Sequence, residues 1–245
     1  MTNKLMLGTL VGLLSLTACG DKTDAAASGS ASAKPAASGA ASGAPKKEEP
    51  AAAKPLTLAQ FTTDVPVAAC KTVVSCKNEE VSVSAGTTMQ MVAGFGGMDD
   101  PKITADLKAI GEAMEKDKRQ VMNASECTTV MGAVTKVSGF SAEKIQPSID
   151  AKKVEFNGEK AAACLAAVSA EPPFCKEEKK VKPDLKLADL EKIMKPYQKE
   201  FEDHLKACDG ALVGKVAIGE ACESGFECAG DEVDCKAKKC VSKTK

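Results

Sequence analysis

Cysteine is the residue type with the clearest chemical potential in this chain, which contains eleven of them. Cys19 stands alone behind an apolar run, and no other cysteine follows until Cys70. Thiols can form disulfides, bind a metal or carry a covalent group, and the choice depends on the compartment. The other ten, an even number, are Cys70, Cys76, Cys127, Cys164, Cys175, Cys208, Cys222, Cys228, Cys235 and Cys240.

The segment before Cys19 indicates export. Residues 1–18 have Lys4 near the start and then an apolar run from Leu5 to Leu16. A membrane-spanning helix needs about 20 apolar residues, so this shorter run is typical of a signal peptide. A secretory signal followed by a free cysteine and a signal anchor are the alternatives.

The four residues Leu16-Thr17-Ala18-Cys19 resemble the lipobox of bacterial lipoproteins. This resemblance implies cleavage after Ala18 and attachment of a lipid to the Cys19 sulfur. We therefore expect a protein of the bacterial cell envelope whose membrane contact is the lipid on Cys19. Gly20, where an aspartate would favour retention in the inner membrane, indicates the outer membrane.

Residues 19–55 are predicted to be a disordered tether. They are mainly Ala, Ser, Gly, Pro and Lys, and from residue 21 to 55 no apolar side chain is larger than alanine. Such a segment buries too little surface to offset its chain entropy. Its reach would be on the order of 30 Å.

Residues 56–210 are predicted to form a helical domain, so the fold is expected to be mainly α. The first predicted helix covers 66–77, with Asp64 as its cap. Further helices are predicted to start at Asp100 before Pro101, at Ser125, at Ser141 and at Asn157. The longest amphipathic pattern runs from Leu187 to Cys208. Gly139 ends the helix over 125–138, and Pro196 should interrupt the longest one. Residues 87–100, TTMQMVAGFGGMDD, contain only a short apolar piece ended by glycines, and 152–157 are the one clear extended piece. With no tryptophan and one tyrosine, we expect small apolar side chains to fill the core and disulfides to reinforce it.

Residues 211–245 are predicted to be a separate cysteine-rich module of loops and short strands. Glycine recurs every few residues, and four cysteines follow one another closely. We expect Cys222 to pair with Cys235 and Cys228 with Cys240. A zinc site is the alternative, although these spacings are looser than the knuckles of structural zinc.

An exported chain with ten cysteines after Cys19 should form five disulfides, which include those of the tail. Cys70 and Cys76 would be separated on one helix by about 9 Å of rise and about 120° of rotation. A disulfide requires Cα atoms within about 7 Å, so these two cysteines should have different partners. Spacing alone leaves the remaining connectivity open.

Catalytic motifs and cofactor sites are not indicated. The single histidine, His204, lies near the end of a predicted helix, where a structural role is favoured over that of a general base. Asp231, Glu232 and Asp234 could offer calcium ligands, although a solvated acidic turn is the better interpretation. A net charge of −1 predicts no nucleic-acid partner. No metal or cofactor is predicted.

Two quoted stretches carry a family resemblance: VEFNGEKAAACLAAVSAEPPFC and, later, ACDGALVGKVAIGEACESGFECAGDEVDCKAKKC. They resemble cysteine-rich lipoproteins and secreted proteins common in myxobacterium-type bacteria, in which a helix with a Cys-Leu step precedes a four-cysteine tail. The tail also loosely resembles the Dickkopf-type cysteine pattern. The resemblance implies a surface-facing lipoprotein and assigns no activity. We expect a non-enzymatic protein that binds an unknown protein partner or supports assembly, and the alternative is an unrecognised enzyme or protein inhibitor acting in the envelope.

Overall fold

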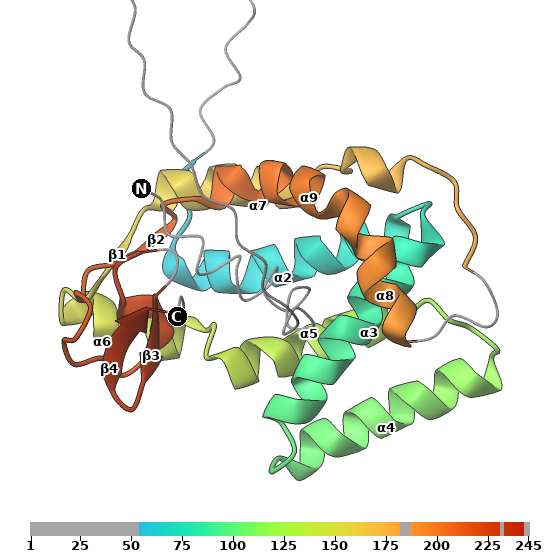
Figure 1. The fold of residues 1–245 in the computed structure, drawn as a ribbon, viewed down its shortest axis with the longest axis horizontal. Coiled ribbons are helices and arrows are strands. Elements are labelled where there is room, and N and C mark those ends of the chain that lie inside the picture. The colour runs from blue at the N-terminus through green and yellow to red at the C-terminus, as the bar shows by residue number, and fades with distance from the viewer. Residues whose placement is uncertain (1–53, 182–186, 231–232, 243–245) are drawn as a thin grey trace, which may run out of the picture.

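The computed structural model describes residues 54–181, 187–230 and 233–242. It is mainly helical, with a cysteine-rich segment of short strands at its C-terminal end, as the sequence predicts (Figure 1). Cys19 and the predicted tether up to residue 53 lie outside the described residues. Among the residues described, no helix combines the length and the apolar character that crossing a membrane requires.

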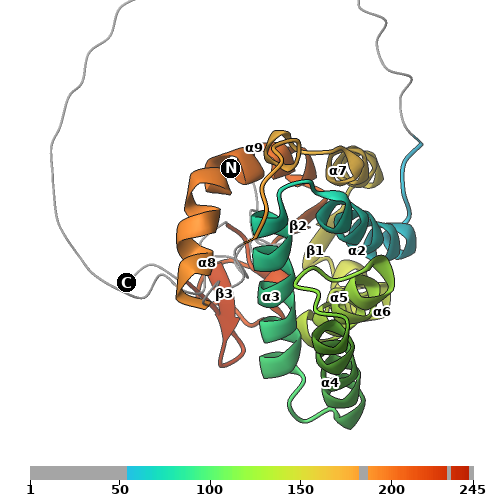
Figure 2. The ribbon, with the colours of Figure 1, turned by 90° about the vertical axis from the view of Figure 1, so that its right-hand side faces the viewer.

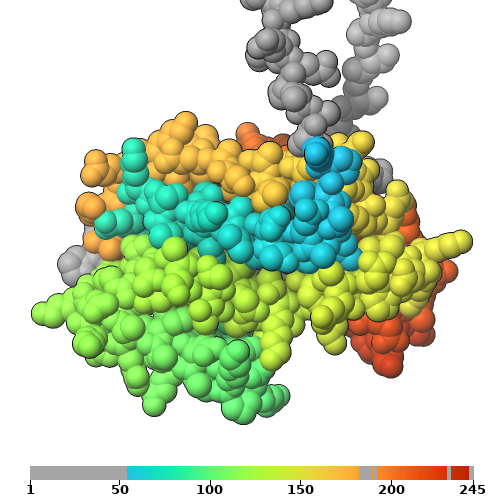
Figure 3. Space-filling model, turned by 180° about the vertical axis from the view of Figure 1, so that it is seen from behind, coloured from blue at the N-terminus to red at the C-terminus, as the bar shows by residue number. Residues whose placement is uncertain are grey.

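Helix α2 (Leu58–Ser75) lies at the centre of the helical part. It contacts α7 (Gly158–Ser169) on one side and α5 (Ala124–Ser138) on the other, and α3 (Glu79–Gly96) packs across α5. Helix α4 (Pro101–Lys116) covers α3 and α5 from outside (Figure 2). Seen from behind, α2 runs across the middle of the molecule, with α5 and α6 (Ala142–Asp150) below it (Figure 3).

The first helix begins earlier than predicted. Asp64 is not its cap, because α2 starts at Leu58 with Thr57 as N-cap. The Thr57 hydroxyl accepts a hydrogen bond from the Gln60 backbone N–H at 3.2 Å, and the Gln60 side chain accepts one from the Thr57 N–H at 2.9 Å. This capping box satisfies two terminal donors, so the helix forms upstream and includes Pro66 in its interior.

The prediction of only a short apolar piece within residues 87–100 was also wrong. Helix α3 begins at Glu79, where the Asn78 side chain accepts a hydrogen bond from the Val81 N–H at 3.3 Å. Its serines and threonines hide the apolar stripe. Ser82 and Thr88 are accommodated because their hydroxyls donate to the carbonyls of Val73 and Ser84, each at 2.8 Å, whereas the buried Ser84 hydroxyl has no hydrogen-bond partner among the described residues.

Other predicted boundaries are confirmed: Asp100, Ser141 and Asn157 cap α4, α6 and α7, and Gly139 ends α5 in the left-handed conformation with φ of 69°. Helix α5 begins at Ala124, one residue before the predicted start at Ser125, and its cap is Asn123. Pro196 interrupts the last long helix. The order there is η1 (Pro173–Cys175), α8 (Leu187–Met194), η2 (Lys195–Tyr197), α9 (Gln198–Leu205) and η3 (Lys206–Cys208).

Four short strands complete the fold. Strand β1 (Val154–Phe156) pairs antiparallel with β2 (Leu212–Gly214). After η4 (Gly225–Glu227), β3 (Val233–Lys236) and β4 (Lys239–Ser242) form an antiparallel hairpin. A side chain at Gly214 would place its Cβ 2.2 Å from the Cys228 carbonyl oxygen, so this close approach requires glycine.

Aromatic side chains contribute more to the core than the composition suggests, because most of them pack together. The Phe61 ring lies 5.7 Å from Phe140 and 5.8 Å from Phe156. Phe174 packs at 5.7 Å from the ring of Tyr197, in a second cluster. The disulfides of Cys70, Cys164 and other buried cysteines fill the space between the helices.

Candidate binding groove

The ten cysteines among the described residues form five disulfides. In the tail the pairs are Cys222–Cys235 and Cys228–Cys240, as predicted. Cys70 pairs with Cys127 and Cys76 with Cys175, so the two neighbours on α2 do have different partners. The fifth disulfide, Cys164–Cys208, joins α7 to η3.

The zinc alternative is not supported by this pairing. The sulfurs of Cys222, Cys228 and Cys240 lie within 4.8 Å of one another, but each belongs to a disulfide and offers no thiolate. Of the acidic turn considered for calcium, Asp231 and Glu232 lie outside the described residues. The Asp234 carboxylate accepts a hydrogen bond from the Cys235 N–H at 2.8 Å.

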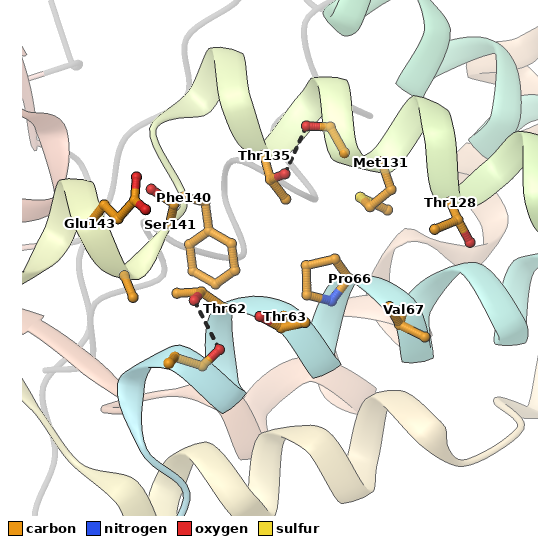
Figure 4. Close-up of a pocket in the computed structure, with 13 residues that line it drawn as sticks. Thr62, Thr63, Pro66, Val67, Thr128, Met131, Thr135, Phe140, Ser141 and Glu143 are labelled. Atoms are coloured by element: carbon orange, nitrogen blue, oxygen red, sulfur yellow. Dashed lines mark hydrogen bonds between the residues drawn. The ribbon is translucent and has the colours of Figure 1, made fainter.

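A surface groove of about 450 Å³ separates α2 from α5 and the start of α6 (Figure 4). Its centre is apolar and consists of Pro66, Met131 and Phe140, with hydroxyl groups around it. The full lining is Ala59, Thr62, Thr63, Pro66, Val67, Thr128, Met131, Gly132, Thr135, Phe140, Ser141, Ala142 and Glu143.

Two sequence features distinguish the walls of the groove. Pro66 in the interior of α2 has no N–H to donate to the Thr62 carbonyl, which removes one helical hydrogen bond at the wall. On the opposite wall, α5 presents Gly132, where an added Cβ would meet no atom within 4 Å. A larger residue at Gly132 would extend into the groove, so the absence of a side chain at this position helps to define its width.

The groove is rich in hydrogen-bond acceptors. The Thr62 hydroxyl donates to the Leu58 carbonyl at 3.0 Å, Thr128 to Ala124 at 2.8 Å and Thr135 to Gly132 at 2.9 Å. With its hydrogen used inside the helix, each hydroxyl oxygen can still accept. Among the described residues that line the groove, Glu143 carries the only charge, and it is also an acceptor. A complementary ligand would therefore supply N–H or O–H donors and apolar groups.

Away from the groove, a cluster of polar side chains surrounds Tyr197. Its hydroxyl accepts a hydrogen bond from the Asn78 amide at 3.2 Å and lies beside Lys179, whose ammonium is 5.1 Å from the ring centroid. Hydrogen bonds to Tyr197 and Glu177 raise the pKa of Lys179, so its ammonium is charged at neutral pH and is unsuited to act as a base. None of these residues lines the groove, and the cluster holds the N-terminus of α3 against the segment after Cys175.

His204 lies in the last turn of α9, as predicted. Burial lowers the pKa of its imidazole, although a hydrogen bond to the Ala167 backbone opposes this effect. A helix C-terminus would favour the protonated imidazole of His204, but desolvation favours the neutral form. His204 does not line the groove.

The sequence did not identify the groove residues. The threonines of α2 and α5 are far apart in the chain, and only packing brings the two walls together. Pro66, which lies inside an apolar run, was the one feature of the sequence that could have pointed to the groove. The fold is that of a mainly helical, disulfide-stapled domain that carries a cysteine-rich C-terminal module. Comparison with family models, with curated proteins and with solved structures gives no match for the chain.

Proposed function

We propose that this protein is a non-enzymatic lipoprotein of the bacterial cell envelope, anchored in the outer membrane through Cys19, that binds a partner protein in the groove between α2 and α5. The supporting observation is the groove itself, which combines an apolar centre with walls of hydrogen-bond acceptors. Peptide segments with apolar side chains and free backbone N–H groups have the complementary chemistry. The Cys70–Cys127 disulfide supports this role, because it joins α2 to α5 and so holds the two walls of the groove together.

Anchoring is tested by Cys19→Ser with metabolic lipid labelling and membrane fractionation. The wild-type chain should carry lipid and sediment with outer membranes, and the variant should do neither. An unlabelled wild type, or a variant that still sediments with membranes, would contradict the anchor.

Binding is tested by blocking the groove without disturbing the fold. Gly132→Leu adds a side chain into the open space of the groove, and Gly111→Leu is the matched control, since Gly111 also lies on a helix with no atom near its added Cβ. A photo-crosslinking residue at Thr63 should capture a partner in the host envelope. The adduct should disappear with Gly132→Leu and persist with Gly111→Leu. An adduct that both variants retain would contradict binding in the groove, and turnover of an envelope substrate by the protein alone would favour the enzyme alternative.

A further inference from the structure

A second, mostly enclosed cavity lies inside the helical domain. It has a volume of about 90 Å³ and is bounded by α2, α3, α7 and α9. Val65, Ala69, Ala85, Met89 and Phe201 are among its apolar walls. It is separate from the groove except that Met131 borders both.

His204 supplies the polar feature of this cavity. Its Nε2 atom is buried and has no hydrogen-bond partner among the described residues. A hydrogen bond between the ring and the Ala167 backbone favours the protonated form, and because Nε2 has no partner among the described residues we assign this bond to Nδ1, which then donates to the Ala167 carbonyl. With Nδ1 protonated, the Nε2 of a neutral imidazole is an acceptor.

The two other polar side chains at the cavity have already used their hydrogens. Thr72 donates to the Val168 carbonyl and Thr88 to the Ser84 carbonyl, each at 2.8 Å. Each threonine oxygen can still accept, so the described lining of the cavity offers hydrogen-bond acceptors and no donor, while the rest of this lining is apolar. A mainly apolar molecule that brings a donor for Nε2 matches this lining.

We propose that this cavity binds a small, neutral, apolar molecule that carries a single hydroxyl group, and that the hydroxyl donates a hydrogen bond to the Nε2 of His204. This inference goes beyond the proposed function, because it involves a different site and a different class of ligand. The size of the ligand is bounded: an engineered protein cavity of roughly 150 Å³ holds benzene, so this cavity of about 90 Å³ suits a molecule of about four non-hydrogen atoms.

Two isomers provide a matched pair of probes. 1-Propanol and methoxyethane have the same formula, but only the alcohol has a hydroxyl donor. Because the chain has one histidine, the ring signals of His204 can be followed by NMR in the full-length protein without ambiguity. We expect a saturable shift with 1-propanol and binding at least tenfold weaker with methoxyethane.

Two variants separate the cavity from its acceptor. Ala85→Leu extends into the cavity and should abolish binding of both probes, with backbone amide shifts as the readout and Gly111→Leu as the control for adding the same side chain elsewhere. His204→Leu should remove the preference for the alcohol. Shifts that grow linearly without saturation, equal binding of the two isomers by the wild type, or binding that survives Ala85→Leu would each overturn the proposal. If Ala85→Leu does not fold, the comparison of the isomers on wild type and His204→Leu still decides it.

Discussion

The Glu227 carboxylate accepts a hydrogen bond from the Ser148 hydroxyl at 2.7 Å, although the two residues are 79 positions apart in the chain. Glu227 belongs to η4 in the C-terminal module and Ser148 to α6 in the helical domain. The carboxylate also accepts from the Lys153 ammonium at 3.2 Å and from the Glu223 N–H at 2.8 Å. One buried acid thus fastens the module to the helices.

Replacing this acid should loosen the attachment. Glu227 is 2% exposed, so Glu227→Gln removes a charged partner where solvent cannot replace it. We expect the free energy of unfolding to fall by about 2 kcal/mol in urea denaturation. Glu155→Gln is the control: its ion pair with Lys215 is exposed, and the loss should stay within about 0.5 kcal/mol. Equal losses in both variants would contradict the role of Glu227.

The disulfides should differ in their effect on stability according to the length of chain that they close. The Cys76–Cys175 pair spans 99 residues and Cys228–Cys240 spans 12. In the chain-entropy model, removal of the first by paired alanine substitutions costs about 5 kcal/mol and removal of the second about 3 kcal/mol. Urea denaturation of the two double variants measures both losses of stability. A larger loss for Cys228–Cys240 than for Cys76–Cys175 would contradict the prediction.

Peptide mapping of the unreduced protein checks the pairing itself. We expect the tail cysteines Cys222, Cys228, Cys235 and Cys240 to be linked only among themselves. A peptide that joins one of them to Cys70 or Cys127 would show a different connectivity.

His204 should make stability depend on pH in mildly acidic solution. Its folded pKa lies below the ordinary value of 6.5, so between the two pKa values the unfolded chain binds more protons than the folded one. Its contribution to stability is therefore fully present above about pH 6.5 and decreases as the pH falls towards the lowered pKa. Chemical denaturation between pH 5 and pH 7.5 should show this slope in the wild type and not in His204→Gln. The same slope in the variant would assign it to other groups.

Two asparagine caps allow a comparison of buried and exposed positions. Asn78 is fully buried, and its amide also donates to the Phe174 carbonyl at 3.4 Å and to Tyr197. Asn157 is exposed, and its side chain accepts hydrogen bonds only from the first turn of α7, from the N–H groups of Glu159 at 3.1 Å and Lys160 at 3.0 Å. We expect Asn78→Ala to cost about 3 kcal/mol and Asn157→Ala about 1 kcal/mol, measured by urea denaturation. Similar losses would show that the contacts of Asn78 beyond α3 contribute little.

Local signals predicted the fold where one residue sets a boundary by itself. Asp100, Asn157 and Gly139 act through bonds or backbone angles within a few residues, so their positions could be predicted. Asp64 misled because a capping box further upstream competes better for the same helix. The hydroxyl-rich face of α3 could not be predicted, since the hydroxyls of Ser82 and Thr88 are satisfied by carbonyls that only the folded and packed helices bring close.

The sequence alone indicated the helical class of the fold, several helix starts and the pairing expected within the tail, because each depends on short-range spacing. Only the tertiary structure decided the three disulfides among the helices, the burial of Glu227 against Ser148, and the two hollows that α2 borders. These features join segments that are tens of residues apart. Their geometry follows from how whole helices pack, which no local pattern specifies.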